Sequence, residues 1–465
     1  MTAKTKRLKR GEWLLAAGVV AVTLVVALGL IRWFAPQLLG IPVDLQMVRV
    51  AKEVPPFYEN IFRKEDIDSQ AFLLKDPYTN VRGRPLLVSP GLVGPHDLLG
   101  FRNYHIPNIA DVVTIGDSQT YGSNVVIDDN WPSQVRGLLR GGRIELYSMA
   151  IGGWSAVQYL NIFRHATSLR PRVIVVAYYT GNDPDESVTA AYSSDLWTSL
   201  RPSKTMDLSD KPRFPGLSSA PSDNWRTQFK SGLKMTFTPA LRLISNDTTY
   251  ATVRAGYEII ETTARLMDAA AAEAGIGLVL TVIPTKELVY AERIRREALP
   301  ADSQYLRLVG FEQQNIDRIA RAFKSLKHAK YVDVVQPLQE AALKSDLLYL
   351  GGPDGHPLTE GYRVIANAVA PVVRGYIAPP PYGLVGVEAG GNGARVHMFL
   401  VDKDGVWRFT SRELVAANGW RPENARLINL RDIAGFPLKG VISVVDRRQF
   451  GPGRFRHAST PGQSH

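Results

Sequence analysis

Between residues 108 and 376, short apolar runs alternate with longer amphipathic stretches. The apolar runs have the length and the β-branched content of buried strands; they are Val112–Ile115, Ile144–Tyr147, Val173–Ala177, Leu278–Ile283 and Tyr331–Val335. Helical periodicity marks residues 131–139, 156–168, 253–274, 311–323 and 359–375. This alternation predicts βαβ units, with a parallel sheet covered by helices on both faces and a functional crevice at the carboxyl ends of the strands.

The N-terminus carries a different pattern, because residues 13–31 contain no charged side chain. As a helix this run would span roughly 28 Å, which is close to the thickness of the hydrocarbon core of a bilayer. Trp13 and Trp33 flank it, and a basic cluster precedes it. We therefore predict a cytoplasmic head over residues 1–11 and a single transmembrane helix over residues 12–34. A cleaved signal peptide is the alternative, although the run is longer than a usual h-region and no Ala-x-Ala site follows it.

Changes of composition divide the rest of the chain. Residues 35–107 form a connector and lead-in, and residues 108–378 form the α/β domain. Residues 186–250 interrupt the alternation and are expected to be a functional lid or a disordered loop. Their aromatic side chains could line a substrate cleft or pack within the loop. Prolines 379–381 form a stiff linker, and residues 379–465 are predicted to be a small β-rich module with a disordered tail.

Composition excludes several classes of protein. The chain has no cysteine, so disulfides, thiolate metal sites and a cysteine nucleophile are excluded. Of the net charge of +11, five positive charges lie before residue 11, and no later Lys/Arg stripe has interleaved aromatics. Nucleic acid is therefore not an expected partner. The histidines lack the spacing of a metal site, so neither a metal nor a cofactor is expected.

Polar residues follow the predicted strands where these end. Gly116 breaks the first apolar run, and Ser118 comes directly after it. A serine in a tight turn at the end of a parallel strand lies beside backbone N–H groups and is well placed to act as a nucleophile. The alternative is that Ser118 caps a helix. Gly153 and Asn182 follow the next two strands, and these residues are expected to converge on one edge of the sheet. His356, near the end of the α/β region, is expected to reach that edge last.

With these segments in order, residues 98–376 resemble the SGNH, or GDSL-type, hydrolase family. The matching blocks are Gly116-Asp117-Ser118, Gly153, Gly181-Asn182-Asp183, and Asp354 with His356. Residues 100–103, Trp131-Pro132 and Gln158 are similar to membrane-anchored bacterial members that are often tied to cell-surface glycans. The second block has Ser148 where an asparagine is usual. The last block has the form Asp-x-His instead of Asp-x-x-His, and so resembles glycan O-acetyltransferase and deacetylase relatives.

The resemblance implies a flavodoxin-like three-layer domain with a serine mechanism. His356 would take the proton of Ser118, and Asp354 would hold the imidazole tautomer. The N–H groups of Ser118 and Gly153 and the side-chain amide of Asn182 would form the oxyanion hole. Asp117 is expected to hold the turn.

The resulting expectation is a serine ester hydrolase that removes O-acyl groups, acetyl above all, from an extracytoplasmic glycan or a small ester. One alternative is an O-acyltransferase that uses the same residues on cell-surface polysaccharide. Another is a non-catalytic subunit of a membrane complex with unidentified partners. In each case the predicted location is the bacterial inner membrane, with the large domain in the periplasm.

Overall fold

The computed structural model describes residues 23, 71–76, 78–88, 91–139, 144–212, 224–377, 381–388, 396–428, 430–434 and 436–452. The predicted head, almost all of the predicted transmembrane helix and half of the connector lie outside these residues. Within the described part, no helix combines the length and the apolar character needed to cross a bilayer. The membrane anchor therefore stays a prediction from the sequence.

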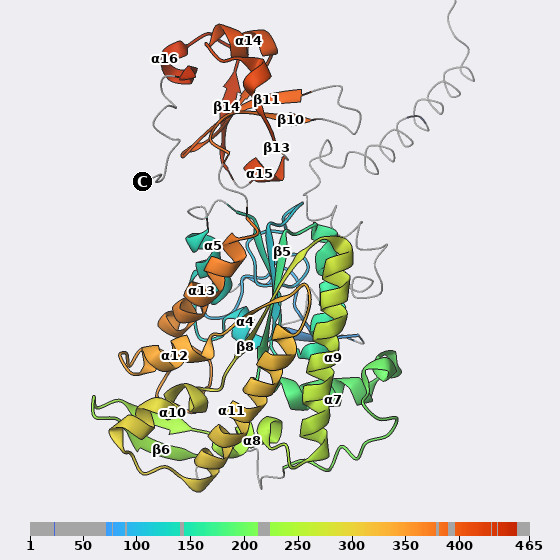
Figure 1. Ribbon diagram of the computed structural model, residues 1–465, viewed down its shortest axis with the longest axis vertical. Coiled ribbons are helices and arrows are strands. Elements are labelled where there is room, and N and C mark those ends of the chain that lie inside the picture. Colours follow the sequence, from blue (N-terminus) through green and yellow to red (C-terminus); the bar gives the residue numbers. More distant parts are fainter. Residues whose placement is uncertain are drawn as a thin grey trace, which may run out of the picture.

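A five-stranded parallel sheet forms the centre of the α/β domain (Figure 1). Its strands are β3 (Val112–Gly116), β4 (Leu146–Ala150), β5 (Val173–Tyr179), β8 (Gly277–Ile283) and β9 (Lys330–Val332). They lie in the order β4-β3-β5-β8-β9, and each neighbouring pair is parallel. In chain order this is the 2-1-3-4-5 arrangement of flavodoxin-like sheets. The switch point of such a sheet lies at its first strand, which here is β3 and leads directly into Ser118.

Helices cover both faces of this sheet, as the alternating pattern predicts. One hydrophobic cluster joins the sheet to α6 (Ala156–Ala166), α7 (Asp183–Ser193), α9 (Ala251–Ala274) and part of α11 (Ser303–Lys324). The other joins it to α5 (Trp131–Leu138), α10 (Lys286–Glu297), α12 (Val335–Ala342) and α13 (Thr359–Arg374). Figure 1 shows α5, α12 and α13 on one side of the sheet and α7 and α9 on the other. Every residue of β5 and β8 is buried, which explains why both strands read as continuous apolar runs.

The five predicted strands are all present, but the last one is shorter than expected. β9 ends at Val332, and Val335 instead begins α12, because the side chain of Asp333 accepts a hydrogen bond from the Val335 N–H and turns the chain. Helix α11 begins eight residues before the predicted start, after an Asp302 cap that accepts from two N–H groups. Helices α7, α10 and α12 were not predicted, and α10 has so many charged residues that its apolar face is narrow.

The segment 186–250 is in large part regular structure, so the expectation of a disordered loop is wrong for its described residues, while the role of a lid stays a prediction. After α7 it contains η6 (Asp195–Leu200), the antiparallel hairpin of β6 (Trp225–Gln228) and β7 (Lys234–Phe237), and α8 (Pro239–Asn246). The Trp225 ring stacks on Phe237 and lies 4.5 Å from the Tyr305 ring, centroid to centroid. Trp197 packs against the core, and the Tyr192 hydroxyl donates to the Ser203 carbonyl. These aromatic side chains therefore pack internally.

The lead-in residues form a scaffold beside β3 and β4. Strands β1 (Leu73–Asp76) and β2 (Asn80–Gly83) make an antiparallel hairpin. The indole of Trp154, which follows the Gly153 loop, donates to the Val81 carbonyl at 2.7 Å. The hairpin is thus joined to the second motif block.

The C-terminal residues form a separate mixed sheet of order β13-β10-β11-β12-β14 (Figure 1). Its strands are β10 (Gly383–Glu388), β11 (Val396–Asp402), β12 (Gly405–Phe409), β13 (Arg426–Ile428) and β14 (Leu438–Ile442). Short helices accompany them at α14 (Arg412–Ala417), α15 (Arg431–Ala434) and α16 (Arg447–Phe450). A hairpin at Gly405 joins β11 to β12. Phe409 is buried and the Trp420 indole donates to the Phe450 carbonyl, so these aromatics serve packing.

Candidate active site

The turn after β3 presents Ser118 at the start of the short helix α4 (Ser118–Tyr121). Asp117 is the N-cap, and its Oδ1 accepts from the Gln119 N–H at 2.8 Å. Ser118 is therefore not the cap, and its hydroxyl is available for another partner. The turn leaves no room for a side chain at Gly116, where a Cβ would lie 2.1 Å from the Thr120 hydroxyl oxygen. The glycine of the first block is thus required by close packing.

Ser118, His356 and Asp354 form one chain of hydrogen bonds, although more than two hundred residues separate the serine from the other two. The Ser118 Oγ lies 2.7 Å from His356 Nε2. His356 Nδ1 lies 2.8 Å from Asp354 Oδ1. In the tautomer that fits both contacts, Nδ1–H donates to the carboxylate and Nε2 accepts from the serine hydroxyl. This is the arrangement of a nucleophile, a base and a group that orients the base.

The short Asp-x-His spacing is compatible with this geometry because Asp354 forms a local turn. Its Oδ1 accepts from the His356 backbone N–H at 2.7 Å as well as from the imidazole. A carboxylate that holds the backbone and the ring of the same residue fixes the ring direction without an additional intervening residue. The form Asp-x-His thus brings the two side chains together.

The charge on Asp354 is stabilised where it lies. Partial burial would raise the pKa of this carboxyl, but the hydrogen bonds from His356, the histidine charge and a hydrogen bond from Asn124 together lower it to about 2. Asn124 also donates to the His356 carbonyl at 3.5 Å. Its φ of 72° is left-handed, a conformation that asparagine tolerates better than most residues. The carboxylate is therefore ionised at neutral pH.

The two other predicted oxyanion-hole residues lie in loops at the same edge of the sheet. Gly153 follows β4 and has a φ of +81°. The neighbouring Gly152 is beside the nucleophile, since a Cβ built there would lie 3.5 Å from the Ser118 Cβ. Asn182 follows β5 as the N-cap of α7, and its Oδ1 is buried without a hydrogen-bond partner among the described residues. The structure thus places both loops at the carboxyl edge, and their role as oxyanion donors stays a prediction.

Buried carboxyl groups lie close to the nucleophile turn. Burial raises the pKa of Asp117 to about 6, although the Gln119 N–H and the charge of His356 oppose this shift. Burial and the neighbouring Asp117 charge raise the pKa of Glu186 to about 7 and that of Asp183 well above its usual range. Asp183 also accepts from the Tyr179 N–H at 2.9 Å and so ties α7 to the end of β5. These carboxyls hold the loops in place, as expected for Asp117.

Residues of the lead-in donate hydrogen bonds to the nucleophile turn and to the second motif block. Arg102 donates to the carbonyls of Gly94, Tyr121, Gly122 and Val125. It therefore pins the loop. Asn103 exchanges two hydrogen bonds of 2.9 Å with the backbone N–H and carbonyl of Ser148. This contact from another segment holds the second block, in which serine stands where the family usually has asparagine.

Several residues at the site were not found by sequence reasoning. Asn103 and Asn124 bind backbone or side-chain atoms of the motif blocks, and Arg242 of α8 donates to the Gly181 carbonyl at 3.4 Å. Lys286 is wholly buried and donates to the Asp354 carbonyl at 2.9 Å. Lys286 has a signal in the sequence, because it follows the carboxyl end of the fourth strand of the sheet. No comparable pattern marks Arg242.

No group of three or more histidine, aspartate or glutamate side chains could hold a metal ion within the described ranges.

The sheet and the site define an α/β protein in which a hydroxyl, an imidazole and a carboxylate form one hydrogen-bonded chain at the carboxyl edge of a parallel sheet. Residues 108–377 thus form the flavodoxin-like α/β domain that the resemblance to SGNH, or GDSL-type, hydrolases implies, with the four motif blocks at the carboxyl edge of the 2-1-3-4-5 sheet. No family model and no curated protein matches the chain.

The chain shares a partial likeness with several solved structures. One is a GDSL-like lipase from Bacteroides thetaiotaomicron, with 14% identity, a TM-score of 0.29, and coverage of 57% of this chain and 87% of that one. A lipolytic protein of the G-D-S-L family from Desulfitobacterium hafniense has 14% identity, a TM-score of 0.30, and coverage of 56% and 98%. A catalytic mutant of an acetylxylan esterase from Geobacillus stearothermophilus has 14% identity, a TM-score of 0.30, and coverage of 57% and 94%. At these TM-scores the matches carry no argument about the chemistry of this chain.

Proposed function

We propose that the protein is a serine ester hydrolase in which Ser118 is the nucleophile, His356 the general base and Asp354 the group that orients the base. The observation that carries this proposal is the continuous pair of contacts, 2.7 Å from Ser118 Oγ to Nε2 and 2.8 Å from Nδ1 to Asp354 Oδ1. A serine hydroxyl is too weakly acidic to attack an ester unaided, and an adjacent oriented base overcomes this.

The reaction would proceed in two halves. His356 Nε2 takes the Ser118 proton as the oxygen attacks the ester carbonyl, and the imidazolium is stabilised by Asp354. The tetrahedral oxyanion is held by the N–H groups of Ser118 and Gly153 and by the amide of Asn182, each worth about 3 kcal/mol in the transition state. His356 then protonates the leaving alcohol. Water, activated by the same histidine, releases the acid from Ser118.

For the substrate, we propose an O-acetyl group on an extracytoplasmic glycan. Two observations on the sequence support this: the Asp-x-His form of the last block and the apolar N-terminal run that predicts a membrane anchor. The anchor would hold the domain in the periplasm of a bacterial inner membrane, within reach of surface polymers. If a sugar hydroxyl instead of water accepts the acyl group from Ser118, the same residues would make the protein an O-acyltransferase.

The test is to incubate the purified chain with an aryl acetate, with and without an acetylatable oligosaccharide, and to measure acetate release and sugar acetylation separately. Ser118→Ala is the variant, and Ser123→Ala, a hydroxyl deletion in the same loop, is the matched control. We expect Ser118→Ala to lower kcat by at least 10³-fold and Ser123→Ala to leave it within twofold, because removal of a triad nucleophile leaves little chemistry.

Labelling with a serine-reactive fluorophosphonate gives an independent readout. The wild type is expected to be labelled and Ser118→Ala is not. Acetylation of sugar in excess of acetate release would favour the transferase. An unlabelled wild type that also releases no acetate would contradict the enzyme proposal, and a non-catalytic role in a membrane complex would then replace it.

A further inference from the structure

The segment that carries Asp354 and His356 is neither a helix nor a strand, so something else must fix its position. It begins after Tyr349, which forms an isolated antiparallel bridge with Pro357. Between these two residues the chain has no sheet or helix partner of its own. We call residues 351–356 the acid–base loop. Its backbone carbonyls need hydrogen-bond donors from outside.

A buried lysine supplies these donors. Lys286 is the first residue of α10, and its side chain is fully buried. Its Nζ donates to the carbonyls of Gly352 at 2.6 Å and of Asp354 at 2.9 Å, both in the acid–base loop. The third hydrogen bond, at 2.9 Å, goes to the carbonyl of Thr236 in β7. An ammonium group has three N–H donors, so these contacts use its full capacity.

The same strand of the β6–β7 hairpin contacts the loop directly. The Thr236 N–H donates to the Gly351 carbonyl at 2.8 Å. The backbone of β7 lies so close to the acid–base loop that a Cβ at Gly351 would lie 2.3 Å from the Lys234 carbonyl oxygen. Just beyond β7, the Thr238 N–H donates to Glu287 Oε1 at 2.7 Å, which joins the strand to the residue after Lys286. The hairpin, the start of α10 and the acid–base loop therefore form one hydrogen-bonded unit.

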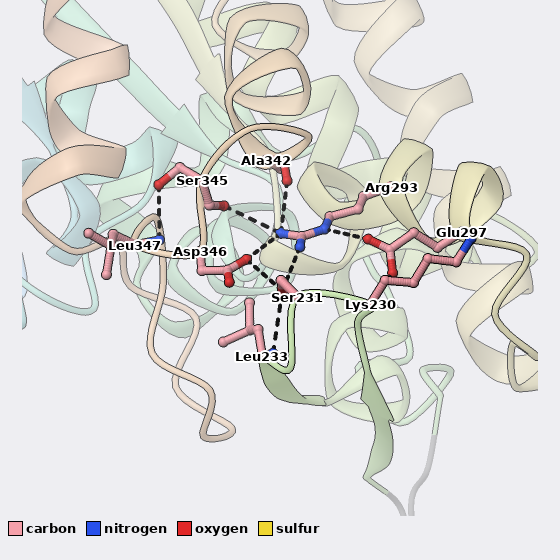
Figure 2. A network of polar contacts seen from close by, with 9 residues as sticks. All are labelled: Lys230, Ser231, Leu233, Arg293, Glu297, Ala342, Ser345, Asp346 and Leu347. Atoms are coloured by element: carbon pink, nitrogen blue, oxygen red, sulfur yellow. Dashed lines mark hydrogen bonds and ion pairs between the residues drawn. The ribbon is translucent and has the colours of Figure 1, made fainter.

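The far end of the hairpin is also joined to α10 by a hydrogen bond from a side chain of that helix (Figure 2). Arg293 of α10 donates to Ser231 Oγ, in the hairpin turn, at 2.9 Å. It also donates to Asp346 Oδ1 at 2.7 Å and to the Ala342 carbonyl at 3.1 Å. Asp346 lies in the chain that leads into the acid–base loop. The hairpin is thus held at both ends, with Lys286 at the end beside the catalytic residues.

We propose that Lys286 is a positioning residue for the proposed reaction: its ammonium fixes the acid–base loop on the β6–β7 hairpin and so sets the approach of His356 to Ser118. This inference rests on the proposed function. The inference also gives the segment 186–250 a role, because its β6–β7 hairpin contacts the acid–base loop and helps to hold it in position. Lys286 touches neither substrate nor the reacting atoms and acts through the backbone of Asp354.

The protonation state of Lys286 follows from its surroundings. Burial lowers the pKa of this ammonium to about 8. Glu287 on α10 and Asp354 in the loop act in the opposite direction, while the positive charge of Arg242 on α8 lowers the pKa further. A neutral amine has two N–H groups for three carbonyls, so one backbone oxygen loses its partner above this pKa. The loop is expected to loosen as pH rises through about 8.

The first experiment measures kcat and KM for aryl acetate as a function of pH in Lys286→Met and Lys286→Arg. Lys234→Met, which changes an exposed lysine of the same hairpin, is the control. We expect Lys286→Met to lower kcat at least tenfold at pH 7 with KM within threefold. The wild type is expected to lose kcat above pH 8, and Lys286→Arg is expected to restore part of kcat without that loss, because arginine keeps its charge. A Lys286→Met enzyme with wild-type kcat and pH profile would overturn the inference.

The second experiment does not depend on activity or on a variant that folds. Hydrogen exchange of the amides at residues 351–356 in the wild-type chain is measured from pH 7 to pH 9 and corrected for intrinsic exchange, with amides of α9 as the reference. The protection of the loop is expected to fall about tenfold through pH 8 while that of α9 is unchanged. Constant protection of the loop would refute the role of Lys286, whereas an inactive wild type with the expected exchange would refute only the proposed hydrolase.

Discussion

At the scale of single residues, the hydrogen bonds of Asp354 determine its charge and its proposed role. Its Oδ1 accepts from both the backbone N–H and the ring of His356, and these contacts with those of Asn124 keep its pKa at about 2. An ionised acceptor at this position favours the histidine tautomer with a proton on Nδ1, so Nε2 is left to accept the serine proton.

Asp354→Asn tests this role at the scale of one atom. The amide can present N–H where the carboxylate accepts, which favours the wrong tautomer. We expect kcat for an aryl acetate to fall by about 10²–10⁴-fold with little change in KM. The measurement is steady-state kinetics together with circular dichroism to confirm folding. Asp333→Asn, whose amide oxygen can still accept the Val335 N–H, is the control and is expected to be fully active. A fall in kcat of less than threefold in Asp354→Asn would exclude the orienting role.

Helix packing positions the third motif block. Helix α7 begins at Asp183, directly after Asn182, and it packs on α9 at Gly256. A Cβ at Gly256 would lie 2.2 Å from the Pro184 carbonyl oxygen, so glycine is what allows the two helices to approach. Gly310 in α11 is the opposite case, because it is exposed and a Cβ there would meet nothing within 4 Å.

This contrast predicts opposite effects for the same substitution. Gly256→Ala is expected to reduce the free energy of unfolding by about 1–3 kcal/mol, because the backbone of α7 has to move. It should also lower kcat by displacing Asn182. Gly310→Ala is expected to increase stability by roughly 0.5–1 kcal/mol, since alanine restricts the unfolded chain and favours the helix. Chemical denaturation of both variants gives the two values. Equal shifts would contradict the close contact between the backbones of α7 and α9.

At the scale of the whole molecule, several buried carboxyl groups make stability depend on pH. Glu312 is fully buried between Thr180 and Thr285, and burial raises its pKa to about 7. Burial likewise raises the pKa of Asp97 to about 7. In the unfolded chain these groups release their protons near their ordinary values of about 4. The folded protein therefore binds more protons between about pH 4 and pH 7, and its stability falls as pH rises through this range.

Glu312→Gln removes the contribution of one buried carboxyl group to the pH dependence of stability. The glutamine side chain cannot ionise. Between pH 5 and pH 8, the free energy of unfolding of the variant should therefore fall less than that of the wild type, and the difference between the two decreases should be up to about 3 kcal/mol. Urea denaturation at the two pH values gives the comparison. Glu340→Gln, at an exposed position of α12, is expected to show the wild-type dependence. A wild-type pH dependence in Glu312→Gln would mean that Glu312 is ionised in the folded protein.

The sequence determined the α/β alternation, because strands covered on both faces are largely apolar, and the short β-branched runs Val173–Ala177 and Leu278–Ile283 are typical of such strands. It also indicated the motif residues, since Ser118 and Asn182 follow strands at the edge where parallel strands end, and His356 precedes the last helix of the domain. The short spacing of Asp354 and His356 is visible in the sequence. The orientation of the His356 ring is not, because one Asp354 carboxylate oxygen accepts hydrogen bonds from both the backbone N–H and the ring of His356 only in the folded turn.

Only the tertiary structure decided what holds these residues together. The segment 186–250 has no sustained period, and its hairpin and α8 become ordered by packing on α10 and α11, elements that follow it in sequence. Lys286 follows the end of a predicted strand, but nothing in the sequence marks its hydrogen-bond partners, which are three carbonyls from residues 50 to 68 positions away. Local patterns encode what a segment prefers by itself. Contacts between distant backbone atoms depend on how the whole chain is brought together, which no local pattern records.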